Sequence, residues 1–265
     1  NYLLEPAPRG TAAVVAMAAA AIQKRDPQAV LAVLTADHFI ENVAGFQNAL
    51  LAANDLAKNG YVVTLGIKPT YAATGYGYVE SGERLGEFHG LTGFQLRRFV
   101  EKPDASRARS FLENSLMNWN SGMFITRADV ILAEYERLLP ELYHNLMEIS
   151  PWLGKDHSNP TFMQTWSTIT PQTIDYGIME KCNCAAVIPT SDLGWNDVGS
   201  WDSFFDVMPP DENGNIILNG KYVGLDTSNS LIVSTDPKAL VVTMGMKNVI
   251  IVNTPTAVLI CPRLI

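Results

Sequence analysis

Two short apolar runs joined by an amphipathic helix constrain the fold of this chain more than any other feature. Residues 30–34 (VLAVL) are wholly apolar and lead into Thr35-Ala36-Asp37, as expected of a strand covered on both faces. Residues 42–59 place apolar side chains on one helical stripe, and Gly60 suits the position after the helix. Residues 61–67 (YVVTLGI) are typical of the following strand. This order predicts an α/β domain with a parallel, doubly wound, Rossmann-like sheet.

The middle of the chain is less regular. We expect the helical stripe of residues 42–59 to consist of Phe46, Leu50, Ala53 and Leu56 or Ala57. Further strands are expected at 94–101 and 122–126, and further helices at 105–114, 128–138 and 174–181. Asp104 and Thr173 are the expected N-caps of two of these helices. Residues 150–172, rich in Pro, Ser and Thr, predict an irregular excursion.

The residue pattern of the sequence changes after residues 209–215 (PPDENGN). Short β-type runs follow, punctuated by Asn, Gly and Asp, and show no helical period: NIIL, YVGL, SLIVS, ALVVTM and VIIVNTPTAVLI. Closely spaced short strands predict a small all-β segment, sandwich-like or solenoidal. We therefore expect two domains, 1–210 and 211–265.

Charge and hydropathy limit the partners. The net charge is −8 and the pI is near 5.0, without a basic stripe, which argues against nucleic-acid binding. The longest uncharged apolar run, Ala12 to Ile22, is shorter than the roughly 20 residues of a membrane-spanning helix, so no membrane partner is expected. An odd cysteine count (Cys182, Cys184 and Cys261) indicates a reducing compartment, so we expect a cytoplasmic protein.

Cys182-x-Cys184 has two interpretations. The pair could hold a metal ion, but no second Cys or His pair has zinc spacing, and we favour ordinary, partly buried thiols. His38, His89, His144 and His157 show no mutual spacing of a metal site and are interpreted as structural.

Two aspartates are candidate metal ligands. Asp37 follows the first predicted strand, where ligands bind in open α/β sheets, and Asp197 lies in GWNDVGSW (194–201). Taken alone, Asp37 is better explained as an N-cap or turn aspartate, and Asp197 is explained equally well as a capping residue. If they meet in one cleft, the two carboxylates suit Mg²⁺, which takes one or two carboxylates together with substrate phosphates.

Three further motifs offer ligand-binding groups. Gly75 and Gly77 in TGYGYVE let a backbone approach a ligand, although a plain turn explains them equally well. Glu101 and Lys102 in FVEKPD suit sugar hydroxyls and a phosphate, respectively, but adjacent Glu-Lys pairs are common on solvated surfaces. Asn120 in WNSGMF offers a bidentate amide, and a β-bulge at Gly122 is the alternative interpretation.

The ordered series of motifs indicates a protein family more specifically than any single motif does. The series comprises EPxxRxTA, LxADHxI, GIxPTxxxTGYGY, FVEKPD, WNSGMF, IDYxxMEK and GWxDVGSW. It resembles the mannose-1-phosphate guanylyltransferases (GDP-mannose pyrophosphorylases) of the sugar-nucleotidyltransferase superfamily and spans about two hundred residues. The tail from Ile216 resembles the short left-handed β-helix that follows the catalytic domain in that family.

The resemblance also implies that something is missing. In the family, a Gly-rich loop (GGxGTRLxP) on the first strand unit cradles the nucleotide phosphates, and this sequence contains no such motif. We therefore expect the chain to lack that first strand and loop and to be impaired in turnover. Gly10, Ala13 and Thr35 also depart from the family pattern.

The resemblance further implies roles for individual residues. Asp37 and Asp197 would bind Mg²⁺, and Lys102 would neutralise the sugar phosphate. Glu101, Asn120 and the Gly75 backbone would hold sugar hydroxyls. Asp175 would line the sugar pocket, although a helix N-terminal aspartate is sufficient explanation. The remaining group would lie near the guanine: Glu5, Pro6 and Arg9.

The implied reaction is attack of mannose 1-phosphate on the α-phosphorus of GTP, which releases pyrophosphate and GDP-mannose; a homodimer is the implied assembly. One alternative is another hexose 1-phosphate or another nucleoside triphosphate as substrate. A second is a non-catalytic fragment that binds a sugar nucleotide, and a third is a purely structural Rossmann-like protein.

Overall fold

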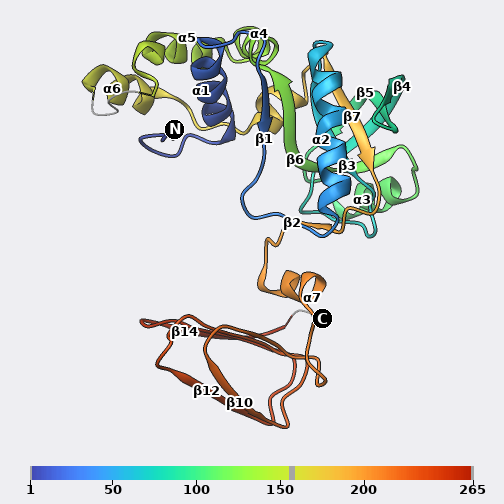
Figure 1. Cartoon of the computed structure of the whole chain (residues 1–265), viewed down its shortest axis with the longest axis vertical. Coiled ribbons are helices and arrows are strands. Elements are labelled where there is room, and N and C mark those ends of the chain that lie inside the picture. Colours follow the sequence, from blue (N-terminus) through green and yellow to red (C-terminus); the bar gives the residue numbers. More distant parts are fainter. Residues whose placement is uncertain (1, 155–158, 264–265) are drawn as a thin grey trace. The chain divides into compact units, whose positions relative to one another are not determined.

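The computed structural model describes residues 2–154 and 159–263 (Figure 1). The chain divides into two compact units. The first comprises Asn1–Thr35 with Asn42–Leu193, and the second comprises Ala36–Glu41 with Gly194–Ile265. The second unit thus includes a short excursion from the N-terminal half of the sequence. The domain boundary near residue 210 stays a prediction.

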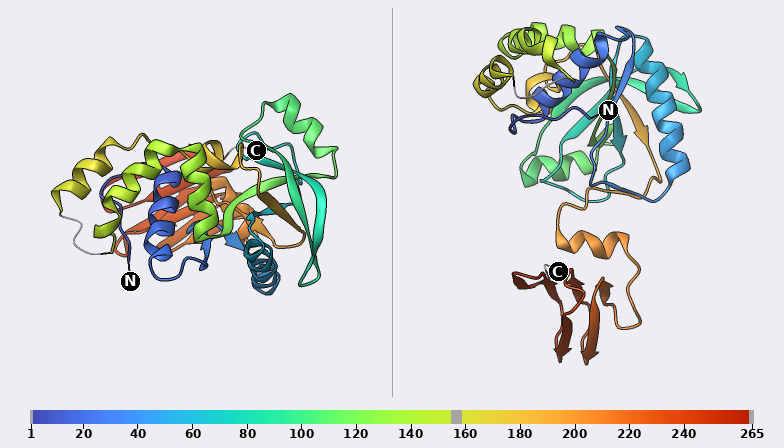
Figure 2. Two further views of the ribbon diagram at one scale, coloured as in Figure 1. Left: turned by 90° about the horizontal axis from the view of Figure 1, so that it is seen from above. Right: turned by 60° about the vertical axis from the view of Figure 1, so that its left-hand side comes forward.

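The first unit is built on a six-stranded sheet. Its strands are β1 (Val30–Val33), β3 (Val62–Ile67), β4 (Tyr78–Phe88), β5 (Leu91–Val100), β6 (Met117–Arg127) and β7 (Ala185–Thr190). Their spatial order is β1-β6-β3-β7-β5-β4. Helices cover the sheet, so the predicted α/β fold class is confirmed (Figures 1 and 2).

The prediction of a parallel sheet is wrong in detail, because the sheet is mixed. β1 and β3 both pair antiparallel with β6, which lies between them, and β3 pairs parallel with β7. The three strands β1, β3 and β7 therefore share one direction, as the strand–helix–strand pattern indicates. β6 is eleven residues long and almost wholly buried, so it can pair with β1 and β3 on its two sides. A local pattern cannot reveal such an insertion, because it depends on a segment some ninety residues away from β1 along the chain.

The helices of the first unit follow local signals closely. They are α1 (Thr11–Gln23), α2 (Val43–Lys58), α3 (Ala105–Leu112), α4 (Ala128–Leu138), α5 (Pro140–Ile149), the 3₁₀ turn η1 (Ser150–Trp152), α6 (Pro160–Thr168) and the π-helix η2 (Asp175–Met179). Asp104 caps α3 as predicted, since its carboxylate accepts from the amides of Ser106 and Arg107. Gly60 follows α2 with a φ of 90°.

Two local predictions fail. Residues 150–172 are not wholly irregular, because Asn159 caps α6 through the amides of Thr161 and Phe162, and Pro160 occupies the first turn. The cap of η2 is Ile174 rather than Thr173, although the Thr173 hydroxyl accepts from the Tyr176 amide at 3.4 Å. Both errors concern short helices whose caps lie inside a Pro- and Thr-rich stretch.

The main core lies where α1, α4, α5 and α6 pack together against the sheet (Figure 1). Helix α1 contributes small side chains, including Ala12, Ala16 and Ala19, each 0% exposed, which lets its backbone approach its neighbours closely. The buried phenol of Tyr135 on α4 donates to the carbonyl of Ala12 at 2.8 Å. Helix α2 packs separately through Ala53, Leu56 and Ala57, whereas Phe46 and Leu50 at the start of its predicted stripe are half-buried.

The second unit is a small solenoid. Its elements are β2 (Phe39–Ile40), β8 (Trp195–Asn196), η3 (Trp201–Ser203), α7 (Phe204–Val207), β9 (Ile216–Leu218), β10 (Lys221–Leu225), β11 (Leu231–Ser234), β12 (Leu240–Met244), β13 (Val249–Asn253) and β14 (Val258–Pro262). β9, β11 and β13 stack in parallel, as do β10 and β12. Ile216, Leu231 and Ile250 align in register to form the core. The predicted β-helix-like tail is thereby confirmed.

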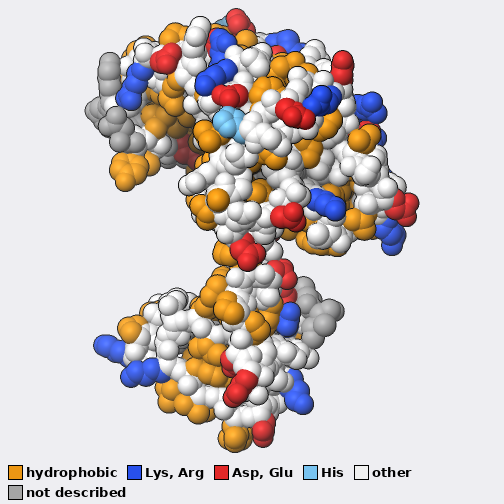
Figure 3. All heavy atoms as spheres, turned by 45° about the vertical axis from the view of Figure 1, so that its right-hand side comes forward, with side chains coloured by type: hydrophobic (Ala, Val, Ile, Leu, Met, Phe, Trp, Pro, Cys, Tyr) orange, Lys and Arg blue, Asp and Glu red, His pale blue; other side chains and the backbone are white. Residues whose placement is uncertain are grey.

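Charged side chains are dispersed on the surface. On the face drawn in Figure 3, Lys and Arg side chains lie interspersed with Asp and Glu. Among the described residues, no helix has both the length and the apolar character to cross a bilayer.

The small-residue face of α1 generates a test of the fold. Ala16→Leu adds three carbons where no space exists, so we expect the free energy of unfolding to fall by about 1–3 kcal/mol. Val14→Leu, on the 37%-exposed side of the same helix, is the matched control and should change it little. The measurement is the midpoint of urea unfolding; equal shifts for both variants would contradict the packing described for α1.

Candidate functional site

Two carboxylates from distant parts of the chain approach each other in the first unit. Glu101 follows the last residue of β5, and Asp175 is the first residue of the π-helix η2. Burial raises the pKa of Glu101 to about 7, and the nearby negative charge of Asp175 contributes to the rise. Burial also raises the pKa of Asp175 above its usual range. Two carboxyl groups with raised pKa values in one place are a feature of functional sites.

A chain of hydrogen bonds fixes this pair to the sheet. The Asn120 amide nitrogen on β6 donates to Asp175 Oδ1 at 3.1 Å. The Asn120 oxygen accepts from the hydroxyl of Thr64 on β3 at 2.8 Å. Thr64 is fully buried, and Asn120 is only 8% exposed. The side chains of β3, β6 and η2 therefore hold one another in a single arrangement.

The β-bulge predicted as the alternative interpretation of WNSGMF is also present. The register between β3 and β6 shifts between Thr64 and Gly66, opposite Phe124 and Asn120. Gly122 lies in this irregularity with a φ of 70°. A bulge changes the direction of the neighbouring side chains. The bulge and a ligand-binding role for Asn120 are therefore compatible.

Lys102 is exposed and has an unusual backbone. Its φ is 45°, in the left-handed region that few residues other than glycine adopt. The positive charge of Lys102 lowers the pKa of both Glu101 and Asp175, against the effect of their burial. Lys102 is therefore close to both carboxylates, in a conformation that costs roughly 1–3 kcal/mol and that is frequent at functional sites.

The glycine loop before β4 contributes close packing. A Cβ added to Gly77 would lie 2.4 Å from Glu101 Oε2, so the carboxylate rests directly against this glycine. The carbonyl of Gly77 accepts from the backbone N–H of Asn120 at 2.8 Å. Gly75, the glycine singled out from the sequence, is exposed with open space around it. Gly77 therefore shapes the carboxylate pair, and Gly75 leaves its backbone accessible.

Aromatic rings gather in the same loop region. Tyr71 and Tyr76 each contact Trp119 edge-on, with ring centroids 4.9 and 5.2 Å apart. Trp119 precedes Asn120 on β6, and Tyr71 is 53% exposed. Such a platform offers apolar surface beside polar side chains, a combination common in ligand sites.

The two predicted metal ligands, Asp37 and Asp197, lie in the second unit. Strands β2 and β8 pair antiparallel, with Phe39 opposite Asn196, which brings the residues before β2 near those after β8. Burial lowers the pKa of His38, while the negative charges of Asp37 and Asp197 act in the opposite direction. His38 Nδ1 accepts from the Trp195 indole at 3.1 Å. Both carboxylates therefore act on one imidazole.

The donor set fits Mg²⁺. Asp37 is exposed and Asp197 half-buried, and carboxylate oxygens are the ligands that this ion prefers. Val198, directly after Asp197, has a φ of 46°, a genuine outlier for a β-branched residue. Its amide is held by the Asn196 side chain at 2.7 Å, so the strained turn is well fixed. Two aspartates beside a rigid turn can hold a hard cation that completes its coordination with other oxygens.

The N-terminal segment lies against the end of α6 in the first unit. The Arg9 guanidinium donates to the carbonyl of Ser167 at 2.7 Å, and the Trp166 indole donates to the carbonyl of Ala7 at 2.8 Å. Glu5 Oε2 and Arg9 Nε are buried atoms without a hydrogen-bond partner among the described residues. Buried polar atoms are normally satisfied, so these two are suited to an incoming polar ligand. Pro6 lies half-buried between them in sequence.

Sequence reasoning missed three contributors to these clusters: Thr64, Glu180 and His38. Glu180 raises the pKa of both Glu101 and Asp175 and lies within IDYxxMEK, so only its role was overlooked. His38 directly follows the singled-out Asp37 but was interpreted as structural. Thr64 gives no signal in a strand pattern, because Thr is common in strands. His157 lies outside the described residues.

The raised pKa of Glu101 makes stability depend on pH. Its folded pKa of about 7 exceeds the unfolded value near 4.5, so the protonated form is favoured by folding. This contribution is complete below pH 4.5 and is lost as the pH rises through 7. We expect Glu101→Gln to lose less stability than the parent chain between about pH 5 and pH 8, measured as urea midpoints. Glu113→Gln, an exposed site after α3, should follow the parent; identical pH profiles for all three chains would contradict the assignment.

Comparison with known proteins places these features in a family. A family model described as "Nucleotidyl transferase" matches residues 1–214. A second, described as "MannoseP isomerase/GMP-like beta-helix domain", matches residues 220–263.

Named relatives agree with the resemblance seen in the motifs. The chain is 36% identical over 267 residues to "Mannose-1-phosphate guanylyltransferase" of Klebsiella pneumoniae, covering 99% of this chain and 55% of that protein. It is 37% identical over 270 residues to "Mannose-1-phosphate guanylyltransferase 2" of Escherichia coli O157:H7, with the same coverage. The chain thus spans about half the length of these curated relatives.

A solved structure shares the fold. The protein described as "mannose-1-phosphate geranyltransferase" from Thermus thermophilus superposes with a TM-score of 0.84 at 29% identity, covering 98% of this chain and 73% of that one. The resemblance drawn from the motifs is confirmed. Because the family match covers residues 1–214 of 265, this chain belongs to the nucleotidyl transferase family.

Proposed function

We propose that the chain carries the chemistry of a mannose-1-phosphate guanylyltransferase, which transfers GMP from GTP to mannose 1-phosphate and yields GDP-mannose and pyrophosphate. The observation that carries the proposal is the alignment of relatives with that name over 99% of the chain. The pairing of Glu101 with Asp175 beside Lys102 supports it, because those residue types suit a sugar phosphate.

The sugar would be held in the first unit. Asn120 and Asp175 are already hydrogen-bonded to each other, so their remaining lone pairs and N–H group are oriented in advance. Glu101, with a pKa of about 7, can both accept from and donate to hydroxyl groups near neutral pH. The exposed backbone of Gly75 adds main-chain groups. This combination matches a polyhydroxylated ligand better than a flat apolar one.

Lys102 would neutralise the sugar phosphate. The second pKa of a phosphate monoester is about 6, so at neutral pH the nucleophile is mostly dianionic and needs no base to activate it. The chain then has to position this dianion and to offset its charge. An exposed ammonium group beside the Glu101 and Asp175 carboxylates is suited to that task.

Asp37 and Asp197 of the second unit would hold Mg²⁺. When bound, the ion neutralises the charge on the nucleotide phosphates and polarises the α-phosphoryl group. Glu5, Pro6 and Arg9 would lie near the guanine, where the buried Glu5 Oε2 and Arg9 Nε would find polar partners. A homodimer and a cytoplasmic location belong to the same proposal.

The function is tested by incubating the chain with MgCl₂, mannose 1-phosphate and either GTP or dTTP. We expect GDP-mannose to form in preference to a thymidine product. Equal use of dTTP would favour a different nucleotide specificity. If no product forms, isothermal titration with GDP-mannose and MgCl₂ distinguishes a binding fragment from a wrong ligand class.

Asp197→Asn tests the metal ligands. Because the amide is a much weaker ligand, we expect the Mg²⁺-dependent part of GDP-mannose binding to be lost and any turnover to fall by roughly 100-fold or more. The melting temperature should stay within about 3 °C, since the substitution conserves shape. Asp226→Asn is the control, because it removes an exposed carboxylate of the same unit at a φ of 52° that Asn tolerates. Full Mg²⁺-dependent binding by Asp197→Asn would refute the assignment.

Lys102→Asn tests the phosphate contact. Asn tolerates the φ of 45°, so the variant removes the charge and retains the backbone. We expect affinity for mannose 1-phosphate, measured by isothermal titration, to fall roughly 10–100-fold, as for loss of a charge-assisted hydrogen bond of about 1.5–3 kcal/mol. Lys68→Asn, an exposed lysine after β3, is the control. A similar loss in both variants would point to general surface charge instead.

A further inference from the structure

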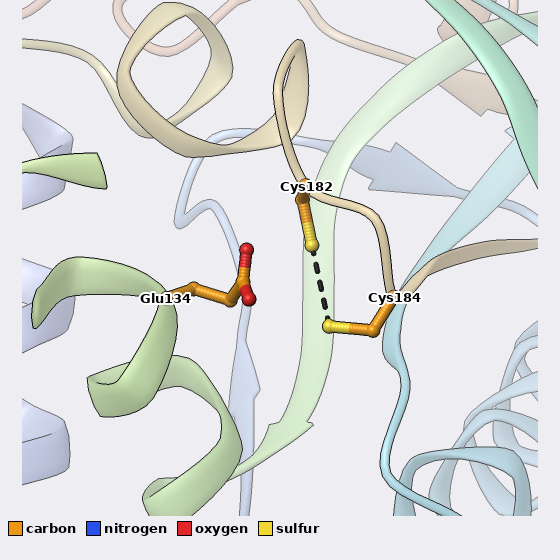
Figure 4. Close-up of side chains that lie close together, drawn as sticks. All are labelled: Glu134, Cys182 and Cys184. Carbon is orange, nitrogen blue, oxygen red and sulfur yellow. Dashed lines mark hydrogen bonds between the residues drawn. The ribbon is translucent and has the colours of Figure 1, made fainter. Parts of the chain in front are cut away.

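Three metal-ligating side chains converge away from the carboxylate pair described above. Glu134, Cys182 and Cys184 place a carboxylate oxygen and two sulfur atoms within 4.8 Å of one another. The two sulfurs lie 3.4 Å apart. Figure 4 shows the three side chains pointing toward one another, one from α4 and two from the segment that enters β7.

The backbone on both sides of the cluster is well anchored. The Cys184 carbonyl accepts from the Val62 amide at 2.9 Å, which fixes this residue at the start of the β3–β7 pairing. The Arg137 guanidinium pairs with Glu134 on the same face of α4 and also donates to the Lys181 carbonyl at 3.1 Å. Arg137 therefore ties α4 to the cysteine segment, and the three donors share a fixed frame.

We propose that Glu134, Cys182 and Cys184 bind one thiophilic divalent cation of the Zn²⁺ class, with water as the fourth ligand. Two thiolates and a carboxylate are a donor set that zinc accepts in tetrahedral geometry. Zinc–sulfur bonds of about 2.3 Å at a tetrahedral angle set the sulfurs roughly 3.8 Å apart. The observed 3.4 Å separation therefore needs only a small adjustment.

The local charges suit a bound cation. Two thiolates and one carboxylate carry three negative charges, which a divalent ion and the Arg137 guanidinium balance. Cation binding would displace the thiol protons of both cysteines, as thiol ligands generally require.

The cluster is accessible from solvent. Cys182 lines a cavity of about 640 Å³ together with Gln95, Arg97 and Glu180. The Glu134 side chain is 14% exposed, and both cysteines are half-buried. An ion can therefore enter without unfolding of the chain. The alternative interpretation of Cys182-x-Cys184, as ordinary thiols, predicts that no ion binds there.

A bound cation would also stabilise the segment between η2 and Cys182, which contains Glu180. Cys182 follows Glu180 by two residues, and Glu180 acts electrostatically on Glu101 and Asp175. A cation that joins the segment after η2 to α4 would restrict the motion of η2. Because it binds the folded chain, it should also raise the melting temperature as its concentration rises.

The test is titration of the fully reduced 265-residue chain with Co²⁺ as a spectroscopic probe, followed by displacement with Zn²⁺. We expect one Co²⁺ per chain, a sulfur-to-cobalt charge-transfer band and intense tetrahedral d–d absorption. Cys182→Ser and Cys184→Ser should each abolish the charge-transfer band or reduce it by about half and weaken binding. Glu134→Gln removes a proposed direct ligand. It should therefore weaken Co²⁺ affinity by at least the roughly 10–100-fold that is typical when a residue hydrogen-bonded to a metal ligand is lost.

Cys261→Ser is the matched control, because it removes the one cysteine of the second unit and should leave the spectrum and stoichiometry unchanged. The proposal is overturned if the band keeps its full intensity in both Cys182→Ser and Cys184→Ser, or if it disappears with Cys261→Ser. It is equally overturned if no band forms while thiol counting finds all cysteines reduced. A thiol count showing that Cys182 and Cys184 stay oxidised under reducing conditions would instead identify a disulfide, which also excludes the metal site.

Discussion

The side chain of Asn120 connects the sheet to the π-helix, and the carboxylate cluster depends on that connection. Its oxygen accepts from the buried Thr64 hydroxyl, and its nitrogen donates to Asp175. An amide is the side chain that can do both at once, because it carries an acceptor and a donor on opposite branches. Without this bridge, no other side-chain hydrogen bond among the described contacts would hold Asp175 against the sheet while burial disfavours its charge.

Each of the two units has a strained backbone residue beside its charged groups. Lys102 has a left-handed backbone beside two carboxylates whose pKa values burial raises. Val198 is strained in the same way next to Asp197 in the second unit. Such conformations persist only where neighbouring structure determines them, and at Val198 the Asn196 side chain, which accepts from the Val198 amide, provides that constraint. Both strained residues therefore adjoin side chains that carry charge.

Local signals predicted local structure well. Asp104 caps α3, Gly60 ends α2 and the β-runs after residue 216 form the solenoid, because each depends on neighbours within a few residues. The errors arose where distant segments decide. The insertion of β6 between β1 and β3 turned a parallel expectation into a mixed sheet. The sequence did not distinguish Gly77 from Gly75 for a similar reason, since only the position of Glu101 shows which glycine must lack a Cβ.

Ordered motifs and periodic patterns were enough to predict the family, the α/β class, the β-helix-like tail and most of the polar residues in the clusters, because they record these features directly. Which of those residues meet depends on the three-dimensional fold. It brought Glu101 near Asp175 beside Asn120, set His38 near Asp197, and brought Glu134 to two cysteines about fifty residues further along the chain. The physical reason is that side-chain proximity follows from strand pairing and helix packing between distant segments, which no local pattern encodes.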